Sequence, residues 1–256
     1  MGTLVKQELY KLVHKRGTWL ALVFMVLVQV GFAVMRQIYP KMMTVKDLAA
    51  NEYIGGLLVL FIMIASTASI IAMEFQYGTI KQLLYRQYYR SQVFISKLIV
   101  LIMQLIGLQA IATGMTFGLT AILAPNFDWQ QAVGTSTFWH QYWLGLAGNA
   151  LVAALLLSVV LLLATWFKSN AAAIAAGFIG YFVLQVASTL LLVLISRWEW
   201  LKWNPFTMLL VGQQLTHERI LAPMTHLETP IMALCTGGYA LLFTLIAYLS
   251  FRKRSV

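Results

Sequence analysis

The sequence predicts an all-α, polytopic membrane protein with six transmembrane helices. Three observations support this prediction. The chain has 256 residues, of which 61% are hydrophobic and only 10% are charged, whereas soluble domains carry about 25% charged residues. The apolar residues gather in six long runs, and the basic residues flank these runs. A soluble fold is therefore excluded, and the net charge of +10 indicates membrane topology and contact with anionic lipid head groups rather than nucleic acid.

Each apolar run is close to the roughly 20 helical residues that cross a hydrocarbon core of about 30 Å. The expected spans cover residues 18–35, 54–73, 98–124, 143–167, 171–196 and 230–251. The first run is the weakest, because it is short and contains Gln29. Pro125 and Asn126 mark the turn between the third and fourth spans.

The distribution of Lys and Arg predicts that both termini are cytoplasmic. With the N-terminus inside, twelve of the 18 basic residues lie on the inner side, as the positive-inside rule requires. They are Lys6, Lys11, Lys15, Arg16, Lys81, Arg86, Arg90, Lys97, Lys168, Arg252, Lys253 and Arg254. Residues 252–256 form a basic cytoplasmic tail in this topology.

The sequence lacks the motifs of membrane enzymes and ion-coupled carriers. It contains no phosphate-binding loop and no pair of histidines at the helical spacing for zinc. No apolar run has an Asp, Glu, Lys, Arg or His away from its ends, although carriers driven by protons or sodium usually keep such groups inside the bilayer. We therefore expect no catalytic residue, metal or cofactor on this chain, and expect a partner to supply any energy for transport.

Residues 1–17 are expected to form an amphipathic helix at the inner membrane interface. Val5, Leu9, Leu12 and Val13 have the spacing of one apolar stripe, and the basic residues lie mostly elsewhere. The alternative is a basic leader that only sets the topology.

Residues 74–97 form a second cytoplasmic element, which is longer than a simple connector. Thr79 can cap a helix after Gly78, and Ile80, Leu83 and Leu84 fall on one face. The pattern predicts a short amphipathic helix parallel to the membrane, with Lys81, Arg86 and Arg90 available to a partner. The alternative is that these cations only follow the positive-inside rule.

The motifs in these two elements resemble those of type-2 ATP-binding-cassette (ABC) permeases. The loop has Glu74, then Gly-Thr-Ile-Lys at 78–81, Leu-Leu at 83–84, Arg90 and Lys97, and the N-terminal helix has Glu8-x-x-Lys11-Leu12. The sequence departs from the family at Gln87 and Tyr89, where Pro and Ser are frequent.

The resemblance implies a permease that pairs with a second permease, of the same or a different chain, and with cytosolic ABC ATPase subunits, which bind ATP and Mg. It also implies that the loop is the coupling helix that docks on the ATPase. The coupling residues are then Glu74, Gly78, Thr79, Lys81, Arg86, Arg90 and Lys97. The residues of the interfacial helix are Glu8, Lys11, Lys15 and Arg16. In this family residues 197–229 correspond to short re-entrant helices at the outer end of the pathway.

Two polar stripes within the spans are candidates for a translocation path or a subunit interface. They are Gln109, Thr113, Thr116 and Thr120 in the third span, and Gln185, Ser188 and Thr189 in the fifth. Gly107, Gly114 and Gly118 lie opposite the first stripe, so we expect that glycine face to pack within the subunit. The alternative is that the hydroxyls bond to their own helix backbone.

The resulting hypothesis is an ABC exporter subunit in a bacterial cell membrane, acting on lipids, hydrophobic drugs or antimicrobial peptides. Small permeases with this loop resemble those of bacteriocin or lantibiotic immunity systems. The alternative hypothesis is a non-transporting immunity or assembly factor that binds its partner within the bilayer.

Overall fold

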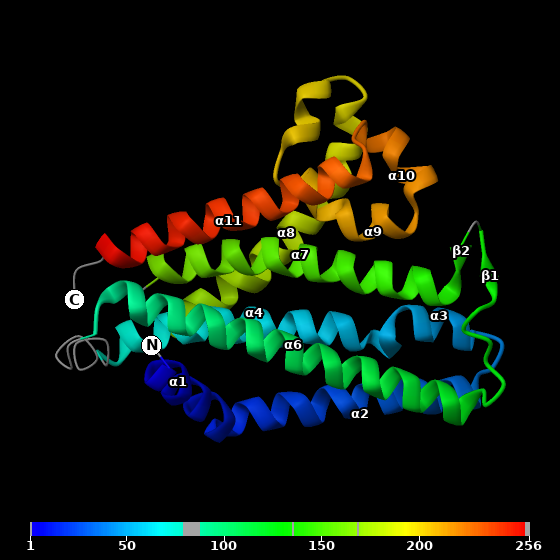
Figure 1. Cartoon of the computed structure of the whole chain (residues 1–256), viewed down its shortest axis with the longest axis horizontal. Helices are drawn as coiled ribbons and strands as arrows, with labels where there is room; N and C mark the ends of the chain where they lie inside the picture. Colours follow the sequence, from blue (N-terminus) through cyan, green and yellow to red (C-terminus); the bar gives the residue numbers. More distant parts are fainter. Residues whose placement is uncertain (1, 79–87, 135, 168, 254–256) are drawn as a thin grey trace. The chain divides into compact units, whose positions relative to one another are not determined.

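The structure is a computed structural model that describes residues 2–78, 88–134, 136–167 and 169–253 (Figure 1). Six of its helices are long and apolar enough to cross a membrane, which confirms the predicted all-α fold and the six spans. They are α2 (Arg16–Ile38), η1 with α4 (Glu52–Ile54 and Gly55–Gln76), α6 (Arg90–Leu123), α7 (Phe138–Trp166), α8 (Asn170–Ile195) and α11 (Thr229–Lys253).

Shorter elements connect these helices. The chain begins with α1 (Gly2–His14), and α3 (Val45–Ala50) precedes η1. A hairpin of β1 (Ala132–Val133) and β2 (Ser136–Thr137) precedes α7, and its two strands pair antiparallel. Within residues 197–229 the chain forms η2 (Glu199–Trp203), η3 (Thr207–Leu210), α9 (Val211–Thr216) and α10 (Glu218–Thr225). Whether this segment is re-entrant stays a prediction.

The third span begins earlier than the hydropathy pattern indicates. Helix α6 starts at Arg90 instead of Leu98, so Arg90 and Lys97 lie on the helix and not in a loop. The Tyr89 backbone N–H donates to the Gln92 side chain at 3.2 Å, which stabilises this helix start. Hydropathy missed the first two turns because they are polar. Thr79, Lys81 and Arg86 of the expected coupling helix lie outside the described residues.

The chain divides into two compact units. The first comprises Met1–Ser66 and Leu83–Trp129, and therefore contains α1, α2, α3, η1, the first part of α4, and α6. Helix α6 is central in this unit, because α1, α2, α3 and η1 all pack against it. Near the end of α2, Ala33, Leu48, Tyr53 and Leu119 form a buried apolar cluster between α2, α3, η1 and α6.

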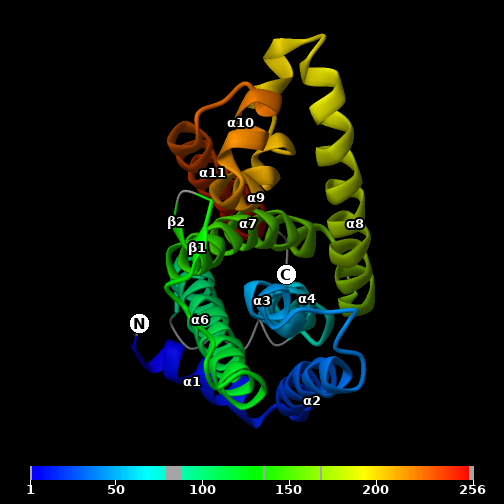
Figure 2. The same cartoon turned by 90° about the vertical axis from the view of Figure 1, so that its right-hand side faces the viewer.

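The second unit comprises Thr67–Gln82 and Gln130–Val256. Helix α7 packs along α11 and also contacts α8 and α9, while α9 and α10 lie between α11 and α8 (Figure 2). Helices α7 and α9 approach closely at two glycines. A Cβ built on Gly148 would lie 2.7 Å from the Gly212 Cα, so this approach requires glycine at residue 148.

Candidate functional site

A buried ion pair joins the N-terminal helix to the first turns of α6, beside which α1 lies (Figure 1). The Lys97 Nζ donates to the Glu8 Oε2 at 2.9 Å, and the Lys11 Nζ donates to the Glu8 Oε1 at 2.7 Å. Glu8 is 6% exposed and Lys97 is 1% exposed. We call Glu8, Lys11 and Lys97 the basal ion cluster.

Two opposing effects act on the Glu8 carboxyl. Burial by itself would raise its pKa, but the charge of Lys97 and the hydrogen bonds from Lys11 and Lys97 lower it. The pKa of Glu8 is below its ordinary value as a result, so Glu8 is ionised at neutral pH. The cluster is therefore a charged contact between α1 and α6 and not a neutral hydrogen bond.

The structure adds a buried acid to the predicted apolar face of α1. Val5, Leu9 and Leu12 are partly buried and Val13 is exposed, while the two buried side chains of α1 are Leu4 and Glu8; contact of the stripe with the membrane stays a prediction. A hydrophobicity pattern cannot identify Glu8 as a buried residue, because its burial depends on Lys97, 89 residues away. Lys15 separates α1 from α2, and Arg16 is the first residue of α2.

The remaining predicted coupling residues lie on different elements. Glu74 is buried near the end of α4, and Gly78 follows it with φ of 66°. Arg90 begins α6. Lys97, a predicted coupling residue, forms an ion pair with Glu8, a predicted residue of the interfacial helix.

A second feature is a break in the chain between α3 and α4. Glu52, Tyr53 and Ile54 have φ values of 52°, 49° and 67°. This left-handed conformation is unfavourable for residues with a side chain, especially for β-branched isoleucine, and costs roughly 1–3 kcal/mol per residue. Contacts outside the segment must therefore hold the break in place.

The Glu52 side chain supplies the first of these contacts. The Gln109 Nε2 donates to both carboxylate oxygens at 2.8 Å, and the Thr113 Oγ1 donates to the Glu52 Oε1 at 2.9 Å. Glu52 is only 4% exposed. The Glu52 carboxyl group thus anchors the break to α6 through three hydrogen bonds.

The second set of contacts comes from α2 and from further along α6. The Gln29 Nε2 donates to the Glu52 backbone oxygen at 2.9 Å and to the Ala112 backbone oxygen at 3.2 Å. The Tyr53 hydroxyl and the Thr120 hydroxyl are 3.2 Å apart and share a hydrogen bond. We call Gln29, Glu52, Tyr53, Gln109, Thr113 and Thr120 the Glu52 cluster. It connects α2, η1 and α6.

Glu52 lies level with the middle of neighbouring helices. Gln29 is about 20 Å along α2 from Arg16 and about 14 Å from Ile38, at 1.5 Å per residue. Gln109 is about 28 Å along α6 from Arg90 and about 21 Å from Leu123. The apolar runs still contain no acidic or basic residue away from their ends, but Glu52 lies between the helices although it precedes the second run. The run 54–73 excludes Glu52, but the break brings it between the helices.

The polar stripe of the third span faces the Glu52 cluster, and its role in a translocation path or a subunit interface stays a prediction. Gln109, Thr113 and Thr120 contact η1, and the Thr116 hydroxyl donates to the Ala112 backbone oxygen of its own helix. The opposite face does not pack as expected. A Cβ built on Gly107, Gly114 or Gly118 meets no described atom within 4 Å. The first unit therefore packs the hydrogen-bonding stripe against Glu52 and leaves the glycine face open.

The polar residues of α8 bond locally. The Gln185 Nε2 donates to the Tyr181 hydroxyl, while Ser188 and Thr189 both donate to the Gln185 backbone oxygen. Their role in a path or an interface stays a prediction. In the part of the chain that the structure describes, no group of three His, Cys, Asp or Glu side chains is arranged to hold a metal ion.

The comparison with known families agrees with this architecture. The family model described as "ABC-2 family transporter protein" matches residues 4–184, which include both clusters. No curated protein matches the sequence. With six apolar helices, an N-terminal helix joined to α6, and this match over more than half of its length, the chain belongs to the ABC-2 transporter family and is a multi-pass membrane permease of an ABC transporter.

Proposed function

We propose that this permease is the membrane subunit of an exporter for amphiphilic molecules such as lipids, hydrophobic drugs or antimicrobial peptides. Separate ATPase subunits bind ATP and Mg²⁺ and supply the energy, and a second permease of the same or a different chain completes the transporter. Both termini lie on the cytoplasmic side of a bacterial cell membrane. The observation that carries the proposal is the buried Glu8–Lys97 ion pair between α1 and α6.

Helix α6 offers a direct mechanical route from this ion pair to the interior of the bundle. It is one continuous helix of 34 residues. Gln109 and Thr113 lie about 18 Å and 24 Å along it from Lys97, at 1.5 Å per residue. A displacement of α1 by the ATPase therefore moves Gln109 and Thr113 against Glu52, where hydrogen bonds hold three unfavourable backbone conformations.

The amphiphilic cargo is assigned to the exposed apolar side chains of the spans and not to the Glu52 cluster, because Glu52 is buried and bonds to its neighbours. Residues 74–97 provide the docking segment for the ATPase, and Arg86 and Arg90 are the cations that we assign to that contact.

The first step of the test is a search of the neighbouring genes for a phosphate-loop ATPase, and the second is co-expression of this chain with the ATPase so found. We expect the ATPase to co-purify after mild detergent extraction and the double variant Arg86→Glu/Arg90→Glu to abolish capture. Lys97→Met should keep capture but lower substrate-stimulated ATP hydrolysis in proteoliposomes. Lys6→Met is the matched control, because Lys6 is an exposed cation on the same helix as Glu8.

Two outcomes contradict the proposal. Absence of an ATPase partner under these conditions favours the immunity or assembly factor that acts without ATP. Equal loss of stimulation in Lys97→Met and Lys6→Met shows that only positive charge matters, and removes the role assigned to the ion pair.

A further inference from the structure

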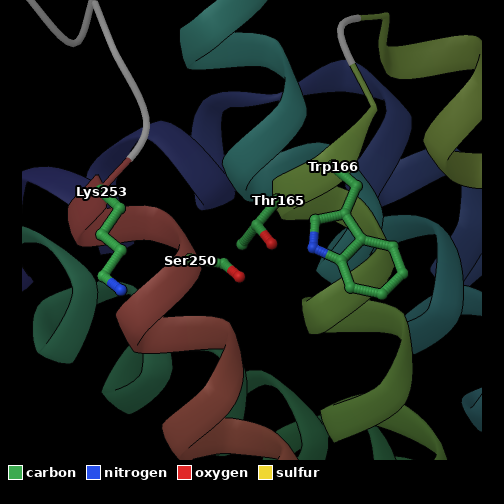
Figure 3. Close-up of a pocket in the computed structure, with 4 residues that line it drawn as sticks. All are labelled: Thr165, Trp166, Ser250 and Lys253. Atoms are coloured by element: carbon green, nitrogen blue, oxygen red, sulfur yellow. The ribbon is translucent and has the colours of Figure 1, made fainter.

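The second unit contains an open hollow of about 420 Å³ at the ends of two spans. Thr165 and Trp166 from the last turn of α7 line it, together with Ser250 and Lys253 from the last turn of α11. Figure 3 shows the Thr165 and Ser250 hydroxyls between the Lys253 side chain and the Trp166 ring. The proposed transport mechanism does not use this hollow.

The hollow has the chemistry of an anion site. Among the ion pairs of the described residues, none neutralises Lys253, and its side chain is exposed at the end of α11. The Ser250 hydroxyl and the Trp166 indole N–H are further donors in the same lining. The Thr165 hydroxyl already donates to the Leu162 backbone oxygen at 2.6 Å and offers an acceptor to a hydroxylated ligand.

The position of the hollow matches the depth of lipid head groups. Trp166 and Lys253 are the last residues of two helices that are long and apolar enough to cross the bilayer. Tryptophan is enriched at this boundary, and lysine attracts anionic lipids there. Trp166 is 62% exposed, so its ring is accessible to a lipid.

An apolar surface continues from the hollow along α11. Leu249, Leu245 and Leu242 lie four, eight and eleven residues before Lys253 and are all exposed. These intervals place them on the same side of the helix as Lys253. An acyl chain can therefore lie along α11 while its head group occupies the hollow.

From this juxtaposition we propose that Thr165, Trp166, Ser250 and Lys253 form a binding site for the head group of an anionic phospholipid, with its acyl chain along the leucine stripe of α11. The lipid phosphate accepts from Lys253 and Ser250. The leucine stripe favours a lipid over free phosphate or an acidic peptide, because neither of these has an acyl chain.

The test uses the purified full-length chain alone, so its result does not depend on transport. The chain is placed in nanodiscs of equal parts phosphatidylglycerol and phosphatidylcholine, and native mass spectrometry counts the lipids that remain bound. We expect phosphatidylglycerol to be retained in preference. Lys253→Gln should lower this preference at least fivefold, since one cation near the membrane surface contributes about that factor.

Arg252→Gln is the matched control, because it removes the same charge one residue away, about 100° around the helix. It should leave the preference within twofold of the wild type. Ser250→Ala should lower the preference without a change of charge. The proposal is overturned if the chain retains both lipids equally, if Arg252→Gln and Lys253→Gln have equal effects, or if inorganic phosphate displaces the bound lipid.

Discussion

Replacing Glu8 by leucine should release α1 from α6. The change removes the carboxylate that accepts from the 1% exposed Lys97, and loss of one partner of a buried ion pair costs about 3–5 kcal/mol. Lys97→Met should destabilise the contact between α1 and α6 by less, because Lys11 still pairs with Glu8 at 2.7 Å. The expected loss is about 1.5–3 kcal/mol, which is typical of one hydrogen bond to a charged group.

Hydrogen exchange of the α1 amides in nanodiscs measures this release directly. At 1.4 kcal/mol per factor of ten, exchange should accelerate roughly 100-fold or more in Glu8→Leu and roughly 10- to 100-fold in Lys97→Met. The double variant Glu8→Leu/Lys97→Met should exchange more slowly than Glu8→Leu alone, because apolar side chains can replace a buried ion pair at little cost. Lys6→Met serves as the exposed control on the same helix.

Additive effects in the double variant would refute this reasoning, because they would mean that Glu8 and Lys97 stabilise α1 independently. Unchanged exchange in both single variants would show that the apolar residues around Leu4 alone hold α1.

Three further predictions concern other features of the molecule. Because the folded pKa of Glu8 is lowered, its stabilisation is present above the unfolded value of 4.5 and is lost as pH falls through the folded pKa. After correction for the intrinsic pH dependence of amide exchange, the protection of the α1 amides should therefore fall in acid, and Glu8→Gln should remove this loss of protection. Glu52→Leu should destabilise the protein by about 2–6 kcal/mol in thermal unfolding, because the buried Thr113 hydroxyl and the partly buried Gln109 amide lose their acceptor. Thr116→Val should destabilise it by under about 1 kcal/mol. Gly148→Ala should lower the free energy of unfolding by about 1–3 kcal/mol in the same assay. Gly145→Ala should lower it much less, because a Cβ at Gly145 makes only an ordinary contact at 3.5 Å. Equal melting temperatures of the two variants would contradict the close approach of α7 and α9.

The six spans could be predicted because each depends on local composition alone. A run of about 20 apolar residues can be recognised as a span without knowing which helices pack against it. The start of α6 at Arg90 could not be predicted from hydropathy, because its first turns are polar and the Tyr89 backbone N–H caps them by donating to the Gln92 side chain.

The Glu52 cluster illustrates what sequence reasoning missed and where a signal existed. Gln29 and Gln109 are amides within apolar runs, and such groups need hydrogen-bond partners in a membrane. Their presence indicates a buried polar partner, and Glu52 is an acid close to the start of the second run. The sequence does not indicate the left-handed conformation of Glu52, Tyr53 and Ile54, because none of these residues favours it.

The sequence by itself determined the class of protein, the number of spans and the family, because hydrophobicity, charge distribution and short motifs are local properties. Only the tertiary structure decided which polar residues meet. Glu8 meets Lys97 across 89 residues of chain, and Glu52 meets Gln109 across 57. The physical reason is that a polar group buried between helices needs a hydrogen-bond partner, which is often a residue far away in the sequence. The local sequence pattern does not determine how distant segments pack, so it does not identify that partner.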